Sequence, residues 1–386
     1  MDLNLNVNLL PVRTYNWLKL NDDTIDEQNI SISRLSFDEP IGLPKGVTLS
    51  KACSEEMVKE IFEEASKEAA DADSLMDRAN GDSSSHDLSQ IVRTGMGIEV
   101  DNLMDEMGVK TDIYTVSENA RPLEALVINN KLLPAEGVLG RQVIVAKENS
   151  EITVIMKYSS ESDNGFNGVS TRLYAESGAK INLIKIQMLG KNVVHFDDIG
   201  GVCDNRGEID IIQMELGASK AWDGCYINLR GRESVFDEKL GYLCRKNQKF
   251  DLNYVADQRG KKTQSDMIFH GVLLDESCKK LRGTIDFKNG STGSVGNEQE
   301  DTLQLSDDVI NKTIPIILCQ EEVVAGRHGA TIGKLGEDLL FYMQSRGIDE
   351  TAAKKIMIRA RLKSIYSLIS DENLRHEVSV YIDQAL

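Results

Sequence analysis

Apolar and polar positions follow a repeat that begins near residue 146. Three segments align under one another, and each runs from a polar turn to a charged residue, an isoleucine, a polar residue and two aliphatic residues: 146–155, 175–184 and 203–212. Their isoleucines, Ile152, Ile181 and Ile209, are 29 and 28 residues apart. A period of this size with alternating apolar residues predicts stacked β-strand coils, because one coil cannot bury its apolar side without neighbours.

The alternation continues on both sides of the repeat, from about residue 95 to residue 333, with almost no helical pattern between the strands. Turn signals separate the later segments at 230–231, 247–248, 259–260 and 289–291. An α/β fold would need a crossover helix after each parallel strand, whereas a parallel β-helix needs none. We therefore predict a mainly β fold, a parallel β-helix (β solenoid) flanked by N-terminal and C-terminal α-helical segments.

The N-terminal part reads as a mixed segment that precedes the solenoid. A helix is predicted over 54–70, capped by Ser54, with an apolar stripe that includes Ile61 and Phe62. Periodicity is lost over 71–87, which we interpret as a loop or linker. Trp17 follows a Pro-initiated turn and is interpreted as a hydrophobic anchor onto another element.

The last fifty residues change to a helical period. One helix begins near Leu339 and ends at Gly347, the next begins at Asp349, and a third is capped by Ser370. The second helix carries an apolar seam in steps of four and three: Ile358, Leu362, Ile365 and Ile369. The helices either cover the end of the solenoid or provide a docking site for a partner, and the pattern favours neither. The predicted domains are 1–90, 91–333 and 334–386.

Composition restricts the cell compartment and the partners. The 386 residues carry a net charge of −18, which argues against a chain-wide surface for nucleic acid. Six cysteines without a C-x-x-C pair predict reduced thiols rather than a zinc ribbon. The chain shows no signal-peptide pattern and no apolar run of the roughly 18 residues that a membrane span requires. The expected location is the cytoplasm, with no membrane association.

Local motifs for catalysis are absent from the sequence. No phosphate loop or dinucleotide fingerprint has the required spacing, and no two histidines are within four residues. His328 lies between glycines, so it could bind iron, although a turn histidine bonded to backbone is the simpler interpretation. Parallel β-helices also include polysaccharide lyases and hydrolases, so a carbohydrate-active enzyme stays an alternative by analogy of fold.

Residues near the C-terminal end of the predicted solenoid resemble a known family. The segments 303–308, 314–316, 325–333 and 340–348 read LQLSDD, IPI, AGRHGATIG and LFYMQSRGI. They resemble the SufB/SufD family, the scaffold proteins of the SUF iron–sulfur cluster assembly system. Three further segments, 10–18, 270–274 and 282–286, are similar to the opening and the penultimate coils of SufD-type members.

The resemblance implies a fold, partners and a site. Family members are right-handed parallel β-helices that pair through their C-terminal β-helix edges and carry the ATPase SufC on their C-terminal helices. His328 matches a SufD histidine that meets a SufB cysteine where a transient iron–sulfur cluster is built, so it is the expected metal ligand. Ile358, Leu362, Ile365 and Ile369 are the expected docking residues. The resemblance also implies that the complex could contain reduced flavin, but no motif in this sequence indicates where it would bind.

Departures from the family pattern favour the SufD role over the SufB role. Gly329 follows the histidine where SufB has glutamate, and the SufB interface cysteine would fall near Val309. Gly326 stands where many members carry a cysteine, and Cys319 could substitute, although a core position is predicted for it. The expectation is a non-enzymatic SufD-like scaffold that pairs with a SufB-type subunit. A SufB-like homodimeric scaffold is the alternative within the family.

Overall fold

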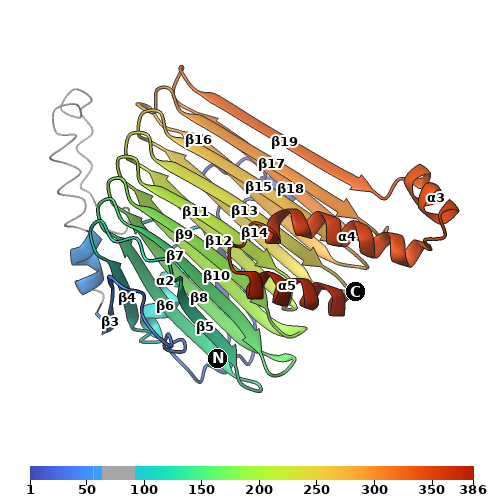
Figure 1. The fold of residues 1–386 in the computed structure, drawn as a ribbon, viewed down its shortest axis with the longest axis horizontal. Helices are drawn as coiled ribbons and strands as arrows, with labels where there is room; N and C mark the ends of the chain where they lie inside the picture. Colours follow the sequence, from blue (N-terminus) through green and yellow to red (C-terminus); the bar gives the residue numbers. More distant parts are fainter. Residues whose placement is uncertain (55, 63–91) are drawn as a thin grey trace.

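Two long sheets face each other in a parallel β-solenoid (Figure 1). The computed structural model describes residues 1–54, 56–62 and 92–386. One sheet has nine strands in the order β18-β16-β14-β12-β10-β8-β6-β4-β3, and the other has eight in the order β19-β17-β15-β13-β11-β9-β7-β5. Because consecutive strands alternate between the sheets, each pair of strands makes one coil. The predicted mainly β solenoid is confirmed.

The strand bounds follow the chain from one coil to the next. The nine-stranded sheet contains β3 (Val47–Cys53), β4 (Thr111–Val116), β6 (Gly137–Ala146), β8 (Asn164–Ala175), β10 (Asn192–Cys203), β12 (Lys220–Leu229), β14 (Lys249–Gln258), β16 (Cys278–Phe287) and β18 (Ile310–Cys319). The eight-stranded sheet contains β5 (Leu126–Leu132), β7 (Glu151–Ser160), β9 (Lys180–Met188), β11 (Glu208–Glu215), β13 (Val235–Cys244), β15 (Gln264–Leu273), β17 (Val295–Gln304) and β19 (Ala325–Lys334). Neighbouring strands are parallel except β3 and β4, which are antiparallel.

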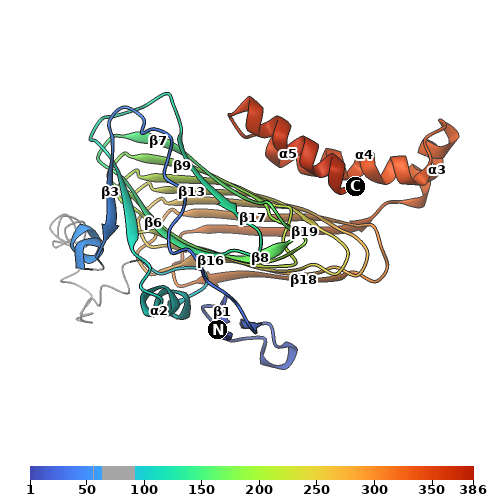
Figure 2. The same cartoon turned by 90° about the horizontal axis from the view of Figure 1, so that it is seen from below.

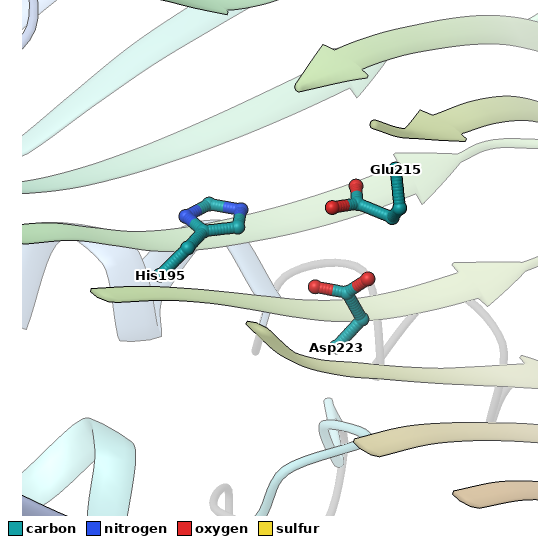
Figure 3. A group of neighbouring side chains, drawn as sticks. All are labelled: His195, Glu215 and Asp223. Atoms are coloured by element: carbon teal, nitrogen blue, oxygen red, sulfur yellow. The ribbon is translucent and has the colours of Figure 1, made fainter. Parts of the chain in front are cut away.

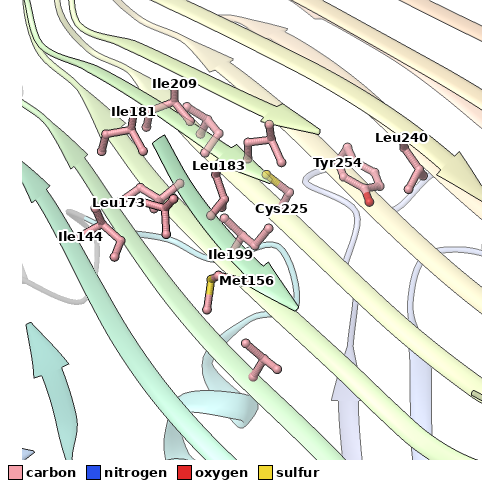
Figure 4. Close-up of a cluster of buried hydrophobic side chains, with 14 of the residues drawn as sticks. Ile144, Met156, Leu173, Ile181, Leu183, Ile199, Ile209, Cys225, Leu240 and Tyr254 are labelled. Carbon is pink, nitrogen blue, oxygen red and sulfur yellow. The ribbon is translucent and has the colours of Figure 1, made fainter. Parts of the chain in front are cut away.

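The sequence repeat is a spatial stack. Ile152 pairs in register with Ile181, and Ile181 pairs with Ile209. All three side chains are buried in the largest apolar cluster, between the two sheets. Figure 4 shows Ile181 and Ile209 within it. Burial of an aliphatic side chain contributes about 1.5–3 kcal/mol, so each coil is stabilised chiefly by the coils beside it.

Segments from both ends of the chain cover the outer faces of the sheets (Figure 2). The N-terminal hairpin β1 (Leu3–Val7) and β2 (Asp23–Glu27) and the helix α2 (Ile98–Glu106) pack on the nine-stranded sheet through a cluster that includes Phe166 and Phe196. A short 3-10 helix, η1 (Asn16–Leu18), lies in the hairpin connection. Residues 56–62 are helical, and Phe62 packs on Tyr174; the rest of the helix and the linker predicted over 54–87 lie largely outside the described residues.

Three C-terminal helices follow the last strand: α3 (Glu337–Ser345), α4 (Glu350–Tyr366) and α5 (Glu372–Ala385). Gly347 has φ 83° and ends α3, and the Asp349 carboxylate accepts a hydrogen bond from the Ala352 backbone N–H at the start of α4. The predicted cap of the third helix is wrong by one position. Asp371, rather than Ser370, accepts the hydrogen bond from the Leu374 backbone N–H, and its charge also favours this helix terminus.

Neither helix of the last pair covers the end of the solenoid. α4 and α5 lie along the outer face of the eight-stranded sheet (Figures 1 and 2), where the seam residues Ile358, Leu362 and Ile365 pack on apolar side chains that include Met214 and Val272. The interpretation of the helices as an end cover is therefore wrong. The interpretation of Trp17 as an anchor is also wrong, because its side chain is 99% exposed.

We expect Leu362→Ala to loosen the C-terminal helices from the solenoid. Leu362 is fully buried under α4, and a large-to-small change in such a core costs about 2–5 kcal/mol. Hydrogen exchange of the α4 and α5 amides should accelerate accordingly. Leu368→Ala, at a half-exposed position just beyond α4, is the matched control and should leave exchange nearly unchanged. Equal effects of the two changes would contradict this packing.

Candidate functional site

The solenoid ends in two sheet edges at the same end of the molecule. Among the described residues, β18 pairs only with β16, and β19 pairs only with β17. Each edge strand is ten residues long and is extended backbone whose outer hydrogen-bonding groups face away from the sheet. All but one residue of β19 are exposed. A second sheet edge from another chain could therefore continue both sheets.

His328 lies on the β19 edge and faces the interior side of the solenoid. Its Cα pairs in register with that of Glu298 on β17, whose side chain is buried inside the solenoid. Register neighbours in a parallel sheet project to the same face, so the imidazole lies over the last closed coil. The side chain is exposed. An accessible imidazole can ligate iron or zinc, and its role as a metal ligand remains a prediction.

Charged side chains form a layer directly beneath this end. The Lys279 ammonium donates to the Glu300 carboxylate at 2.5 Å, and the Tyr242 hydroxyl donates to the same carboxylate at 3.2 Å. Burial opposes ionisation of Glu300, but the adjacent Lys279 holds its pKa below the usual value. Burial raises the pKa of Glu298 to about 8, and the negative charge of Glu300 is the second cause of this increase. Its surroundings therefore favour the protonated form of the Glu298 carboxyl.

Cys319 is also at the open end, at the last position of β18. Its side chain is exposed, and its thiol donates to the Glu321 carbonyl at 3.0 Å. It lines a hollow of about 440 Å³ together with Pro11, Val12 and Tyr226. The predicted core position of this thiol is wrong, because β18 is an edge strand whose end is not covered by a further coil.

A second group of ionisable side chains lies deep between the sheets, and the sequence analysis did not find it. It contains Lys185, His195, Asp197, Glu215 and Asp223, all at most 1% exposed. Burial lowers the pKa of His195 to about 4 and raises that of Glu215 to about 8. The sequence did contain a signal for it: charged residues stand at alternate strand positions that are predicted to face inward.

Lys185 shows that signal most clearly. It follows Ile181 and Leu183 at alternate positions of β9, so its side chain faces inward as theirs do. The alternation of the strand predicts an apolar residue at such a position.

The predicted docking residues Ile358, Leu362, Ile365 and Ile369 are all buried against the eight-stranded sheet or its flanking loops. In this conformation a partner that touched them would have to displace α4 and α5, and their docking role stays a prediction. Other apolar side chains of the C-terminal helices are exposed: Phe341 and Tyr342 on α3 and Ile356 on α4.

The acidic groove that would favour a carbohydrate-active enzyme, three aligned carboxylates with an arginine, does not occur in the hollow beside Cys319. Asp286 is its one lining carboxylate, and it is paired with Lys288. Asp257, in register with Asp286, is bonded to Tyr226 and Arg259. Within the described part of the chain, no helix combines the length and the apolar character needed to cross a membrane.

Curated relatives of this chain carry names from iron–sulfur cluster assembly. A chloroplastic SufBD family protein of Arabidopsis thaliana is 27% identical over 246 residues, 61% of this chain and 44% of the relative. A SufD of Plasmodium berghei is 27% identical over 249 residues, 62% of this chain and 18% of the relative. A SufD of Bacillus subtilis is 24% identical over 250 residues, 63% of this chain and 56% of the relative. The matched stretch thus spans less than two thirds of each relative.

A family model supports the same assignment over most of the solenoid. The model, described as SUF system FeS cluster assembly, SufBD core domain, matches residues 127–361. That range runs from β5 into α4 and includes both edge strands and His328. The chain therefore belongs to the SufBD family of the SUF iron–sulfur cluster assembly system.

Proposed function

We propose that this chain is a SufD-type, non-enzymatic scaffold subunit. It pairs with a SufB-type subunit through the β18 and β19 edges, and the cluster assembled at that junction is cargo rather than a resident cofactor. The observation that carries the proposal is the end of the solenoid, where two ten-residue edges and the exposed His328 coincide. Two of the relatives are named SufD, which supports the SufD role over the SufB role.

Edge pairing supplies the physical reason for association. Exposed parallel edges promote pairing with any compatible strand, and natural proteins usually block or cover them. Here Pro315 is the one edge residue that cannot donate a backbone hydrogen bond, and the N-terminal loop packs on β18 through Leu10 and Leu20. The same loop presents Trp17 to solvent, and exposed aromatic side chains are enriched at protein interfaces.

At the junction, an imidazole nitrogen of His328 would bind the metal cargo, and the other edge strand ends in the exposed thiol of Cys319. Protein-bound iron–sulfur clusters are held mainly by cysteine thiolates. Since His328 supplies nitrogen alone, the partner subunit provides further ligands. A pair of different subunits can therefore complete a ligand set that the isolated chain does not supply.

A SufC-type ATPase is proposed to dock on the C-terminal helices. The seam of α4 holds them on the solenoid, and Phe341, Tyr342 and Ile356 provide an accessible apolar surface on α3 and α4. Large apolar and aromatic side chains exposed next to one another are typical of protein contacts. Movement of these helices by the ATPase would be transmitted to the outer face of β11, β13 and β15.

The six free thiols support a reducing compartment such as the cytoplasm. Neither described hollow supports a flavin site. The hollow lined by Ile41, Leu43 and Val127 has no aromatic side chain, and the other offers only Tyr226, whose hydroxyl is bonded to Asp257. No step of the proposed function depends on flavin.

We expect His328→Ala to fold and pair normally but to lower cluster assembly roughly tenfold or more, the effect of losing a metal-site group. Assembly is measured by reconstitution of the complex with iron and a sulfide source, followed at the cluster absorption. His376→Ala, an exposed histidine of α5, is the control. Full assembly by the His328 variant would remove this imidazole from the mechanism.

We expect Ile332→Glu to weaken pairing with a SufB-type subunit roughly tenfold or more, because a charge would be buried at the junction. Ile332 is 48% exposed on β19, on the same face as His328. Leu123→Glu, at a fully exposed position before β5, should leave affinity unchanged. Affinity is measured by analytical ultracentrifugation. Tight self-association of the chain alone, abolished by the Ile332 change, would instead favour the homodimeric scaffold.

We expect Phe341→Asp to lower binding of a SufC-type ATPase roughly tenfold or more, as for other buried aromatic contacts. Phe341 is 73% exposed, so the fold of the chain alone should not change. Leu133→Asp, at an exposed corner of the solenoid, is the control in the same pull-down titration. Undiminished binding by the Phe341 variant would exclude the outer helix face as the docking surface.

A further inference from the structure

The interior of the solenoid is polar along one side. In β9 and β11 the inward-facing positions near the strand start are apolar, as at Ile181 and Ile209, whereas Lys185 and Glu215, further along these strands, are ionisable and buried. Glu215 ends β11, and the facing strands β10 and β12 contribute His195 and Asp223 (Figure 3). Three consecutive strands of two adjacent coils thus bring an imidazole and two carboxylates together in the buried interior.

The three side chains have the spacing of a metal site. One ligand atom from each of His195, Glu215 and Asp223 lies within 4.8 Å of the others. Ligand atoms bound to one ion at about 2.0–2.2 Å are separated by about 3–4 Å, so closure around an ion requires shifts of only about an ångström. The side chains point toward one another across the interior (Figure 3).

The imidazole is held in one orientation by Asn167. His195 Nδ1 lies 3.0 Å from the Asn167 backbone carbonyl, which can only accept, and 3.1 Å from the Asn167 side-chain amide nitrogen, which can only donate. The side-chain oxygen of Asn167 accepts a hydrogen bond from Asn130. Metal-binding histidines commonly donate the N–H of their second ring nitrogen to a carbonyl oxygen. His195 Nε2 is thus the ring nitrogen left for a metal, in the tautomer whose Nδ1 hydrogen is donated to the Asn167 carbonyl.

Unpaired polar atoms at the centre of the cluster point to a cation. Among the described residues, His195 Nε2, Glu215 Oε2 and both oxygens of Asp223 are buried without a hydrogen-bond partner. Buried polar groups are almost always paired, and each unpaired one costs about 1–3 kcal/mol. Lys185 does not supply the missing charge, because it is bonded to Asp197 at 2.5 Å. Two carboxylates remain, the charge that one divalent ion balances.

We propose that His195, Glu215 and Asp223 bind one divalent first-row transition ion, such as Fe²⁺, Mn²⁺ or Zn²⁺, inside the solenoid. One nitrogen and two carboxylate oxygens suit this class, and the absence of a sulfur donor from the three excludes a soft-metal preference. The ion joins three consecutive strands of two adjacent coils, so its role is structural. Because the ligands are fully buried, it enters while the coils close and exchanges slowly afterwards. The site does not depend on the scaffold role.

The test is the metal content of the untagged full chain. The chain is produced with iron, zinc and manganese salts, purified without chelator and analysed by inductively coupled plasma mass spectrometry. We expect about one ion per chain, and a roughly tenfold loss in His195→Gln and in Asp223→Asn. Glu238→Gln is the matched control, because Glu238 is an equally buried interior carboxyl outside the cluster. It should retain the ion.

X-ray absorption at the edge of the bound metal supplies the second measurement, on the unaltered chain. A shell of oxygen and nitrogen with imidazole scattering supports the site, even if the variants fail to fold. A chain without metal would overturn the proposal and would mean that protons neutralise the carboxyls. Metal that persists in both ligand variants, or a shell that contains sulfur, would overturn it equally.

Discussion

In-register backbone pairing between successive coils is the constraint on which the structure depends. Each interior strand donates and accepts hydrogen bonds on both sides, and its inward side chains are covered by the coils before and after it. Ile152, Ile181 and Ile209 illustrate this, since each packs on the next in register. Such a stack has no intrinsic end. The last coil, β18 and β19, makes the same groups available without a further coil to satisfy them.

The outer faces of the two sheets, unlike the terminal edges, are covered by other segments of the chain. The outer face of the nine-stranded sheet is covered by the N-terminal hairpin and α2, and the outer face of the eight-stranded sheet is covered by α4 and α5. Covering segments thus occupy both broad faces and leave the terminal edges accessible. This division leaves the end of the solenoid, with His328 on β19, accessible for the association that we propose.

The fold was predictable from the sequence because its alternation and its period are local. The site was only partly predictable. The motif singled out His328, whose role as a metal ligand stays a prediction. The exposure of Cys319 depends on β18 being an edge, which no local pattern reveals. The seam of Ile358, Leu362 and Ile365 was recognised as apolar, yet whether it contacts a partner or the chain's own sheet depends on tertiary packing. His195, Glu215 and Asp223 are separated by 20 and 8 residues, and only the coil geometry brings them together.

The most direct test of the central claim is amide hydrogen exchange of β18 and β19, measured for the chain alone and with a SufB-type subunit. If another subunit completes the solenoid, the exposed edge amides of both strands gain protection on mixing, while those of interior strands such as β10 do not change. Unchanged exchange at β18 and β19 in a complex that nevertheless forms would contradict the account.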